Sequence, residues 1–296
     1  MAFADLLRLI ALAACWGLAF VFIGVAVPSI GPFALVEMRA IIAGMLLLAC
    51  LRFTGLRLDL GRNWARYFVN GAIGSALPFV MVAKAQTVQS ASYSVVLVAM
   101  APLFSAFVAA VWIGERFAWR KGAGLIVGLT GVALLTGWNP SAAATPPPWA
   151  IGLTLGAAVC YGVAGVYAKK HAAEIAPLAA ATGSQLAAAV MLLPAALASL
   201  PIAMPSLTVL ANVLALAVFS SACAFLLYFR LIANVGPVKT VAVNYLTPVF
   251  GVGGGVFFLN EKLTANIALG ALAIFAGLTL VMLRASWAQA PTARLP

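Results

Sequence analysis

Pro102-Leu103-Phe104 followed by Gly114-Glu115, and Pro248-Val249-Phe250 followed by Asn260-Glu261, are two copies of one pattern. In each copy a glutamate follows a proline by thirteen residues, and the two copies lie 146 residues apart (261 − 115 = 248 − 102 = 146). Gly124 with Gly270, and Gly131 with Gly277, match at the same interval. Proline and glutamate are scarcer here than apolar residues, so their joint match predicts a duplicated unit.

The composition places this duplicated unit in a membrane. Hydrophobic residues make up 65% of the chain and charged residues 8%, with a mean hydropathy of +1.12; soluble domains carry about 25% charged residues. Three stretches contain no charge at all: Leu9–Val36, Gly122–Ala168 and Ile175–Phe229. A spanning helix needs about 20 residues, so each of the last two holds two spans. The sequence predicts an all-α integral membrane protein, and duplication inside such a protein is typical of transporters.

Several other classes of function are disfavoured by the residues present. The four cysteines (Cys15, Cys50, Cys160 and Cys223) lie in apolar runs without disulfide or metal-ligand spacing. The net charge of +11 comes from bases in short loops between spans, which argues against a nucleic-acid partner. No nucleotide-binding motif or nucleophile–base arrangement stands out. We therefore expect no enzyme activity, no cofactor and no bound metal.

Apolar windows and breaking residues predict ten transmembrane helices. They are Leu6–Val27, Phe33–Leu51, Trp64–Ala83, Ala91–Ile113, Trp119–Gly137, Trp149–Ala168, Pro177–Ser199, Leu207–Phe229, Val238–Phe258 and Asn266–Leu283. This divides the chain into a first five-helix repeat (1–138), an outer proline-rich linker (139–148), a second five-helix repeat (149–284) and a cytoplasmic tail (285–296). The first span also resembles a signal peptide. Because Ala13–Phe22 recurs as Ala158–Tyr167, we expect it to be retained as a span.

The basic residues predict the orientation. With a cytoplasmic N-terminus, the cytoplasmic side carries thirteen bases and the outer side only Lys84 and Lys262. The thirteen are Arg8, Arg52, Arg57, Arg62, Arg66, Arg116, Arg120, Lys121, Lys169, Lys170, Arg230, Arg284 and Arg294. This bias predicts a multi-pass protein of the bacterial inner membrane with both termini in the cytoplasm.

An odd number of spans in each half means that the second half enters the membrane from the opposite side. The halves are then inverted repeats around a shared central site, which rocking exposes to either side in turn.

Two segments resemble a known family. Gly114-Glu115-Arg116-Phe117 with Gly124-Leu125-Ile126-Val127-Gly128, and Asn260-Glu261-Lys262-Leu263 with Gly270 and Gly277, are similar to the EamA-type motif. The resemblance to the drug/metabolite transporter superfamily implies ten helices in two inverted halves. Within it, the chain looks most like bacterial exporters of amino acids and related metabolites, including aromatic ones.

Aromatic and polar residues in the middle of the spans are the candidates for a substrate-binding wall. They are Trp16, Arg39, Ser75, Phe79, Met100, Tyr161, Gln185, Asn244 and Tyr245. Ser220 and Ser221, inside the eighth span, are further polar groups at this depth. Embedded charges are costly and so mark candidate sites, and Arg39 suits a substrate carboxylate. Taken singly, each of these residues also fits an ordinary helix contact. The second half has Thr182 and Ser184 where the first has Glu37 and Arg39, so we expect any polar role there to belong to the first half.

Three prolines are candidate hinges or gates: Pro78, Pro102 and Pro248. A proline inside a helix frees a carbonyl and bends the helix, although a fixed bend that only aids packing is the alternative. Glu115 and Glu261 fit a helix N-terminal cap or a loop ion pair.

These observations predict an inner-membrane carrier that exports small organic metabolites, amino acids including aromatic ones, by alternating access. A drug-like cation exporter and a nucleotide-sugar or phosphometabolite carrier are the alternatives within the superfamily. A membrane-embedded enzyme or a channel is the alternative from another class. The expected partners are a small-molecule substrate and the lipid bilayer; the oligomeric state stays open, a monomer included.

Overall fold

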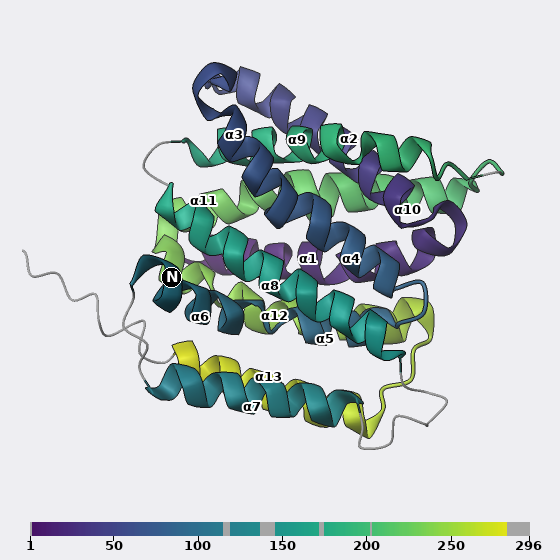
Figure 1. Ribbon diagram of the computed structural model, residues 1–296, viewed down its shortest axis with the longest axis vertical. Helices are drawn as coiled ribbons and strands as arrows, with labels where there is room; N and C mark the ends of the chain where they lie inside the picture. The colour runs from purple at the N-terminus through teal and green to yellow at the C-terminus, as the bar shows by residue number, and fades with distance from the viewer. Residues whose placement is uncertain (1, 115–118, 137–145, 172–174, 202, 283–296) are drawn as a thin grey trace, which may run out of the picture.

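The computed structural model describes residues 2–114, 119–136, 146–171, 175–201 and 203–282. Within those ranges the chain is helical and contains no β-strand. The helices run side by side in one bundle (Figure 1). Their bounds are α1 Phe3–Ile30, α2 Pro32–Phe53, α3 Leu60–Gly71, α4 Leu77–Ala85, α5 Ala91–Val98, α6 Ala101–Ile113, α7 Trp119–Thr136, α8 Pro148–Lys170, α9 Pro177–Leu197, α10 Leu207–Ala217, α11 Ala224–Thr240, α12 Val243–Leu259 and α13 Ala265–Met282.

Length and apolarity bear out the membrane prediction in its general form. Seven helical segments in the described ranges are long and apolar enough to cross a bilayer, and two shorter apolar helices, Val243–Leu259 and Ala265–Val281, follow them. The protein is therefore an all-helical, multi-pass membrane protein. The count of ten spans stays a prediction.

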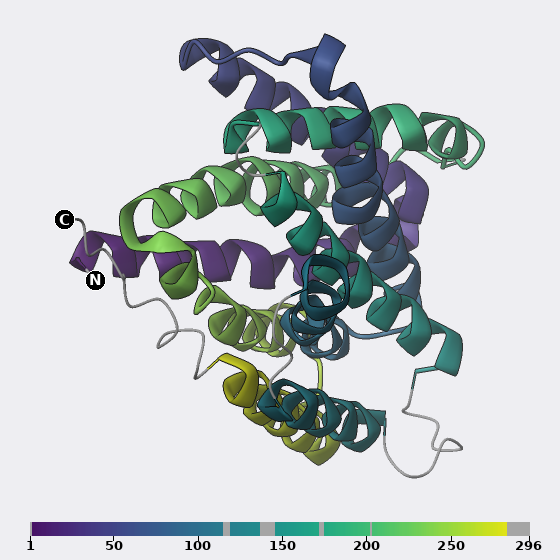
Figure 2. The same cartoon turned by 60° about the vertical axis from the view of Figure 1, so that its left-hand side comes forward.

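Two contacts between α7 and α13 show the duplication directly. A Cβ added to Gly124 would lie 2.6 Å from the carbonyl oxygen of Gly277, and one added to Gly131 would lie 2.8 Å from that of Gly270. Gly270 is the counterpart of Gly124, and Gly277 is the counterpart of Gly131, 146 residues further along the chain. Replacing each glycine by its counterpart therefore converts one contact into the other. That exchange is the mark of a two-fold interface. Glycine lets the backbones touch here, as small residues do between membrane helices, and both views show the two helices adjacent (Figures 1 and 2).

The first helix of each half, α1 and α8, also packs closely against another helix at a glycine. A Cβ on Gly17 of α1 would meet the backbone of Thr247 and Gly251 on α12. A Cβ on Gly162 of α8 would meet the backbone of Ala101 and Ser105 on α6. Thr247 follows Ala101, and Gly251 follows Ser105, by 146 residues. The two packing sites therefore correspond.

The helices therefore form two groups, each built from both halves of the chain. In the α1 group, α1 packs against α10, α11 and α12. In the α8 group, α8 packs against α4, α5 and α6. Helices α2 and α9 pack together at one side of the groups, and α7 and α13 pair at the other (Figure 2).

The structure interrupts four of the predicted spans. The ninth, predicted over Val238–Phe258, is divided between α11, which ends at Thr240, and α12, which begins at Val243. The third and eighth each contain a π-helical turn, η1 at Ala72–Ala76 and η2 at Val218–Cys223, and these turns begin 146 residues apart (218 − 72 = 146). The fourth span is broken between α5 and α6, whereas the sequence predicts one helix over Ala91–Ile113. π-Turns inside α-helices frequently occur at functional sites.

The three candidate hinge prolines lie in different settings. Pro102 lies in the first turn of α6, just after the break, where its missing N–H costs nothing. Pro78 lies in the first turn of α4, just after η1. Only Pro248 lies inside a continuous helix, α12. Their hinge role stays a prediction.

Candidate functional site

Arg39 is the charged centre of the candidate site. Its side chain projects from α2 and is buried, with 6% of the residue exposed. The Nε of Arg39 donates to Ser221 Oγ at 2.8 Å, and the guanidinium carbon lies 3.7 Å from the centroid of the Phe79 ring. Tyr161 extends the cluster, because its ring centroid lies 6.4 Å from that of Phe79. Four helical elements, α2, η2, α4 and α8, thus meet around one guanidinium.

The charge of Arg39 has no carboxylate partner among the described residues. The ion pair found among those residues joins Arg8 to Asp5 instead. Burying a charge without a counter-charge is expensive, and one hydrogen bond with one aromatic face offsets only part of that cost. A guanidinium presents five N–H donors in a fork that fits a carboxylate. The arrangement is therefore complementary to an anionic group entering the bundle.

A second hydrogen bond joins the halves in a similar way. The Nε2 of Gln185 on α9 donates to Ser75 Oγ in η1 at 3.0 Å. Ser221 follows Ser75 by 146 residues, and Gln185 lies one residue after Ser184, the position that the sequence matches with Arg39. Ser184 Oγ itself accepts a hydrogen bond from Asn70 Nδ2 at 2.7 Å, so the expectation that the polar role belongs to the first half alone is wrong for hydrogen bonding. Only the charge is one-sided. The Oε1 of Gln185 is buried without a partner among the described groups, which leaves an acceptor available at the site.

A cavity of about 40 Å³ lies between α1, α5 and α12. A water needs roughly 10–15 Å³ by this measure, so the cavity holds a few waters and is too small for an organic substrate. It is lined by Phe20, Val95, Val98, Ala99, Asn244, Thr247 and Pro248. Two predicted residues, Asn244 and Pro248, are therefore beside open space in this conformation.

The other predicted residues lie apart from this cavity. Trp16 of α1 packs on Tyr228 of α11, with ring centroids 5.6 Å apart. Tyr245 packs toward Phe275 of α13, 6.4 Å between centroids. Met100 is fully buried in the break between α5 and α6, where its sulfur lies beneath Gly128. Of the nine candidates, the structure brings together Arg39, Phe79 and Tyr161, and separately Ser75 with Gln185.

Some site residues were missing from the predicted wall. Phe20, Val95, Val98 and Thr247 line the cavity, yet they resemble every other apolar position in the sequence. Ser221 was already among the polar candidates from the sequence, and it is also the counterpart of Ser75.

The two ends of the site are packed differently. At the predicted outer end, α5 of the α8 group packs against both α1 and α12 of the α1 group. At the predicted cytoplasmic end, α6 packs against α7, α8 and α13, and within the described residues it makes no comparable contact with α11 or α12. The duplication would make these ends equivalent, so the conformation is asymmetric and closed at the end where α5 meets α1 and α12.

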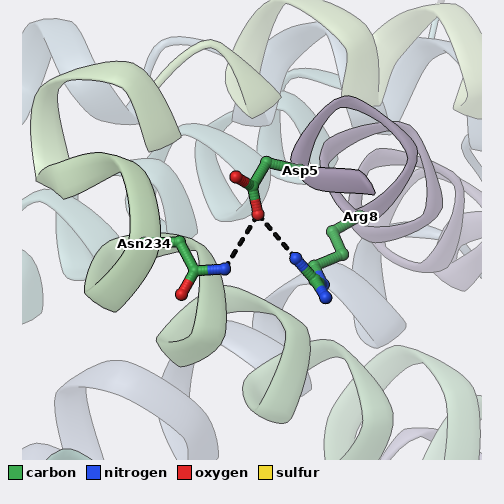
Figure 3. Close-up of polar contacts among 3 residues, drawn as sticks. All are labelled: Asp5, Arg8 and Asn234. Atoms are coloured by element: carbon green, nitrogen blue, oxygen red, sulfur yellow. Dashed lines mark hydrogen bonds and ion pairs between the residues drawn. The ribbon is translucent and has the colours of Figure 1, made fainter. Parts of the chain in front are cut away.

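A polar contact holds the start of α1 to α11. Asp5 Oδ1 accepts hydrogen bonds from Arg8 Nη1 at 2.6 Å and from Asn234 Nδ2 at 2.9 Å (Figure 3). This contact lies inside the α1 group, so it stabilises the group without linking it to the α8 group.

Comparison with known proteins identifies the family. The model of the EamA-like transporter family matches residues 4–137 and 148–283. A "Probable terminal-alkyne amino-acid exporter" of Streptantibioticus cattleyicolor is 27% identical over 90% of this chain and 89% of its own length. The "Uncharacterized inner membrane transporter YedA" of Escherichia coli (strain K12) is 30% identical over 86% of this chain and 83% of its own.

A solved crystal structure shares the fold, with a TM-score of 0.67 and 19% identity over 96% of this chain and 98% of that chain. The relatives are named as transporters rather than enzymes. The sequence resemblance is therefore confirmed: this chain is a membrane transporter that belongs to the EamA-like transporter family.

Proposed function

We propose that this protein is an inner-membrane carrier that exports small carboxylate-bearing metabolites, with amino acids, aromatic ones included, as the preferred class. The observation that carries the proposal is the buried Arg39 guanidinium, which lies against Phe79 and has no carboxylate partner in the described chain. A substrate carboxylate would supply the missing counter-charge.

The surroundings of Arg39 favour an amino acid over a simple carboxylate. Phe79 and Tyr161 offer ring faces to an aromatic or aliphatic side chain. The free Oε1 of Gln185 is an acceptor for an ammonium group. The exporter from S. cattleyicolor is named for an amino-acid cargo, which supports the same class here.

Alternating access fits the asymmetric packing. We infer ten spans in two inverted halves, with both termini in the cytoplasm because the bases gather on that side. In this conformation α5 closes the outer end, while α6 stands away from α11 and α12. The structure is then a state that faces the cytoplasm, in which substrate enters before the outer end opens.

A cation exporter is the second candidate, because Glu37 offers a buried carboxylate. Its residue is 6% exposed, and its Oε2 has no partner among the described groups. A nucleotide-sugar carrier has less support, since Arg39 is the one buried base in the described ranges.

Counterflow in proteoliposomes tests the proposal and separates these candidates. Vesicles loaded with unlabelled phenylalanine should accumulate external labelled phenylalanine, with saturation. Excess 3-phenylpropionate, which keeps the carboxylate, should compete, whereas 2-phenylethylamine, which keeps only the ammonium group, should not. The reverse order of competition would favour the cation exporter. No exchange of phenylalanine, tyrosine, threonine or methionine by folded protein would contradict the amino-acid assignment.

A further inference from the structure

Glu261 joins the two helix groups at the outer end of the site. It lies in the turn after α12, yet both of its carboxylate oxygens accept hydrogen bonds from the start of α5. The backbone N–H of Ala91 donates to Oε1 at 2.7 Å, and that of Ser92 donates to Oε2 at 2.9 Å. Such charge-assisted bonds to a helix N-terminus are stronger than neutral ones. One side chain thus caps a helix of the opposite group.

The turn is shaped to place this carboxylate. Asn260 ends α12 with a positive φ of 54°, and the Glu261 N–H closes the turn by donating to the Gly255 carbonyl at 3.1 Å. A Cβ on Gly255 would lie 2.5 Å from both Glu261 Oε2 and Ser92 Oγ. Gly255 therefore leaves the space that the carboxylate and the helix end occupy.

The same contact seals the cavity. Ser92, Val95 and Ala99 follow one another on one face of α5. Ala99 and Val95 line the cavity. Val95 also packs against α12, because a Cβ added to Gly251 would lie 2.7 Å from Val95 Cγ1. Ser92 continues this face outward, and its Oγ is buried with no hydrogen-bond partner among the described groups. A buried hydroxyl without a partner gains hydrogen bonds if this surface becomes wet.

We propose that Glu261 is a positioning residue of the transport cycle: its carboxylate holds α5 against α12 and keeps the outer end closed. When the outward-facing state forms, the two bonds break and the α5 face that carries Ser92 becomes exposed to water. This inference rests on the alternating access proposed above, but on no particular substrate. Glu115, the counterpart of Glu261, lies outside the described residues, and the inference concerns Glu261 alone.

Cysteine labelling tests this in the full chain with its four cysteines replaced by alanine. One reporter is Ser92→Cys, treated with a membrane-impermeant maleimide from the outer side. The other is Val241→Cys, in the turn between α11 and α12 at the cytoplasmic end, treated from the cytoplasmic side. In Glu261→Ala, outer labelling of Ser92→Cys should rise roughly fivefold or more, and inner labelling of Val241→Cys should fall, because two favourable bonds of the inward-facing state are lost.

Opposite changes at the two reporters are the decisive result, since general loosening of the fold would raise both rates and overturn the proposal. Unchanged labelling at both reporters would also overturn it.

A second variant covers the case in which Glu261→Ala folds poorly. Glu261→Gln keeps one carbonyl acceptor, so its labelling rates should lie between those of wild type and Glu261→Ala. Asp59→Ala is the matched control: it removes the side-chain cap of α3, where Asp59 Oδ1 accepts from the Arg62 N–H at 3.1 Å, and should change neither rate. Because labelling needs no substrate, failure here is distinct from failure of the amino-acid assignment.

Discussion

Arg39 and Ser221 are 182 residues apart in the chain, yet the Nε of Arg39 lies 2.8 Å from the Oγ of Ser221. The bond joins a helix of the first half to the π-helical turn of the second. A similar bond, from Gln185 of the second half to Ser75 of the first, joins the halves in the opposite sense at 3.0 Å. One of these two donors carries a charge and the other does not.

Removing the Ser221 hydroxyl, which accepts the hydrogen bond from Arg39, should weaken substrate binding. In Ser221→Ala, Arg39 loses its side-chain hydrogen bond and its fork becomes less well oriented. We expect the KM for phenylalanine counterflow to rise roughly threefold to tenfold, the effect of about one hydrogen bond. Ser75→Ala is the matched control in the other half and should change KM less, because it removes a neutral bond. Equal effects of the two variants would argue against a special role for Arg39.

Shortening Phe79 should reduce affinity for aromatic substrates in particular. Phe79→Ala removes the ring under the Arg39 guanidinium, a contact worth about 0.5–2 kcal/mol. The ring is also the proposed contact for an aromatic cargo. We expect phenylalanine exchange to fall more than threonine exchange, measured side by side in the same vesicles. Phe257→Ala, at a residue that is 79% exposed, should affect neither. A uniform loss for both substrates would show that Phe79 supports Arg39 without contacting the cargo.

Filling the glycine contact between α7 and α13 should destabilise the protein. In Gly124→Val the new side chain would meet the Gly277 carbonyl and the Val281 side chain. Overpacking of this kind costs about 1–3 kcal/mol. Thermal unfolding in detergent should show a lower Tm for Gly124→Val. The control is Gly152→Ala on α8, where nothing lies within 4 Å of an added Cβ and alanine favours the helix. A Tm for Gly124→Val equal to that of wild type would contradict the packing described here.

Much of the fold was predictable because it depends on composition and spacing. Apolar runs longer than a bilayer is thick can only be membrane helices, and the shared Pro102/Pro248 and Glu115/Glu261 interval identifies the duplication. The break after α5 and the π-helical turn η1 had a local signal, because each lies one turn before a proline, Pro102 and Pro78, that was expected to bend its helix. No proline lies in the eighth span, so η2 was not predictable from local residues.

The site was partly predictable for the same reason. Arg39 was identifiable because a charge in an apolar span is conspicuous. Its partner Ser221, and the capping of α5 by Glu261, depend on which helices become neighbours. Glu261 was expected to cap a helix or pair in a loop. The structure confirms the cap and adds that the capped helix belongs to the opposite group.

Counterflow by Arg39→Gln tests the central claim most directly. This substitution removes the buried charge and keeps a hydrogen-bond donor for Ser221. Arg57→Gln, at an exposed basic residue, is the control for loss of a positive charge. With both proteins folded and reconstituted equally, we predict that Arg39→Gln lowers phenylalanine exchange by roughly tenfold or more, the cost of a lost charge-assisted contact, while Arg57→Gln stays near wild type. Exchange by Arg39→Gln at the rate of wild type would contradict the claim that Arg39 receives the substrate carboxylate.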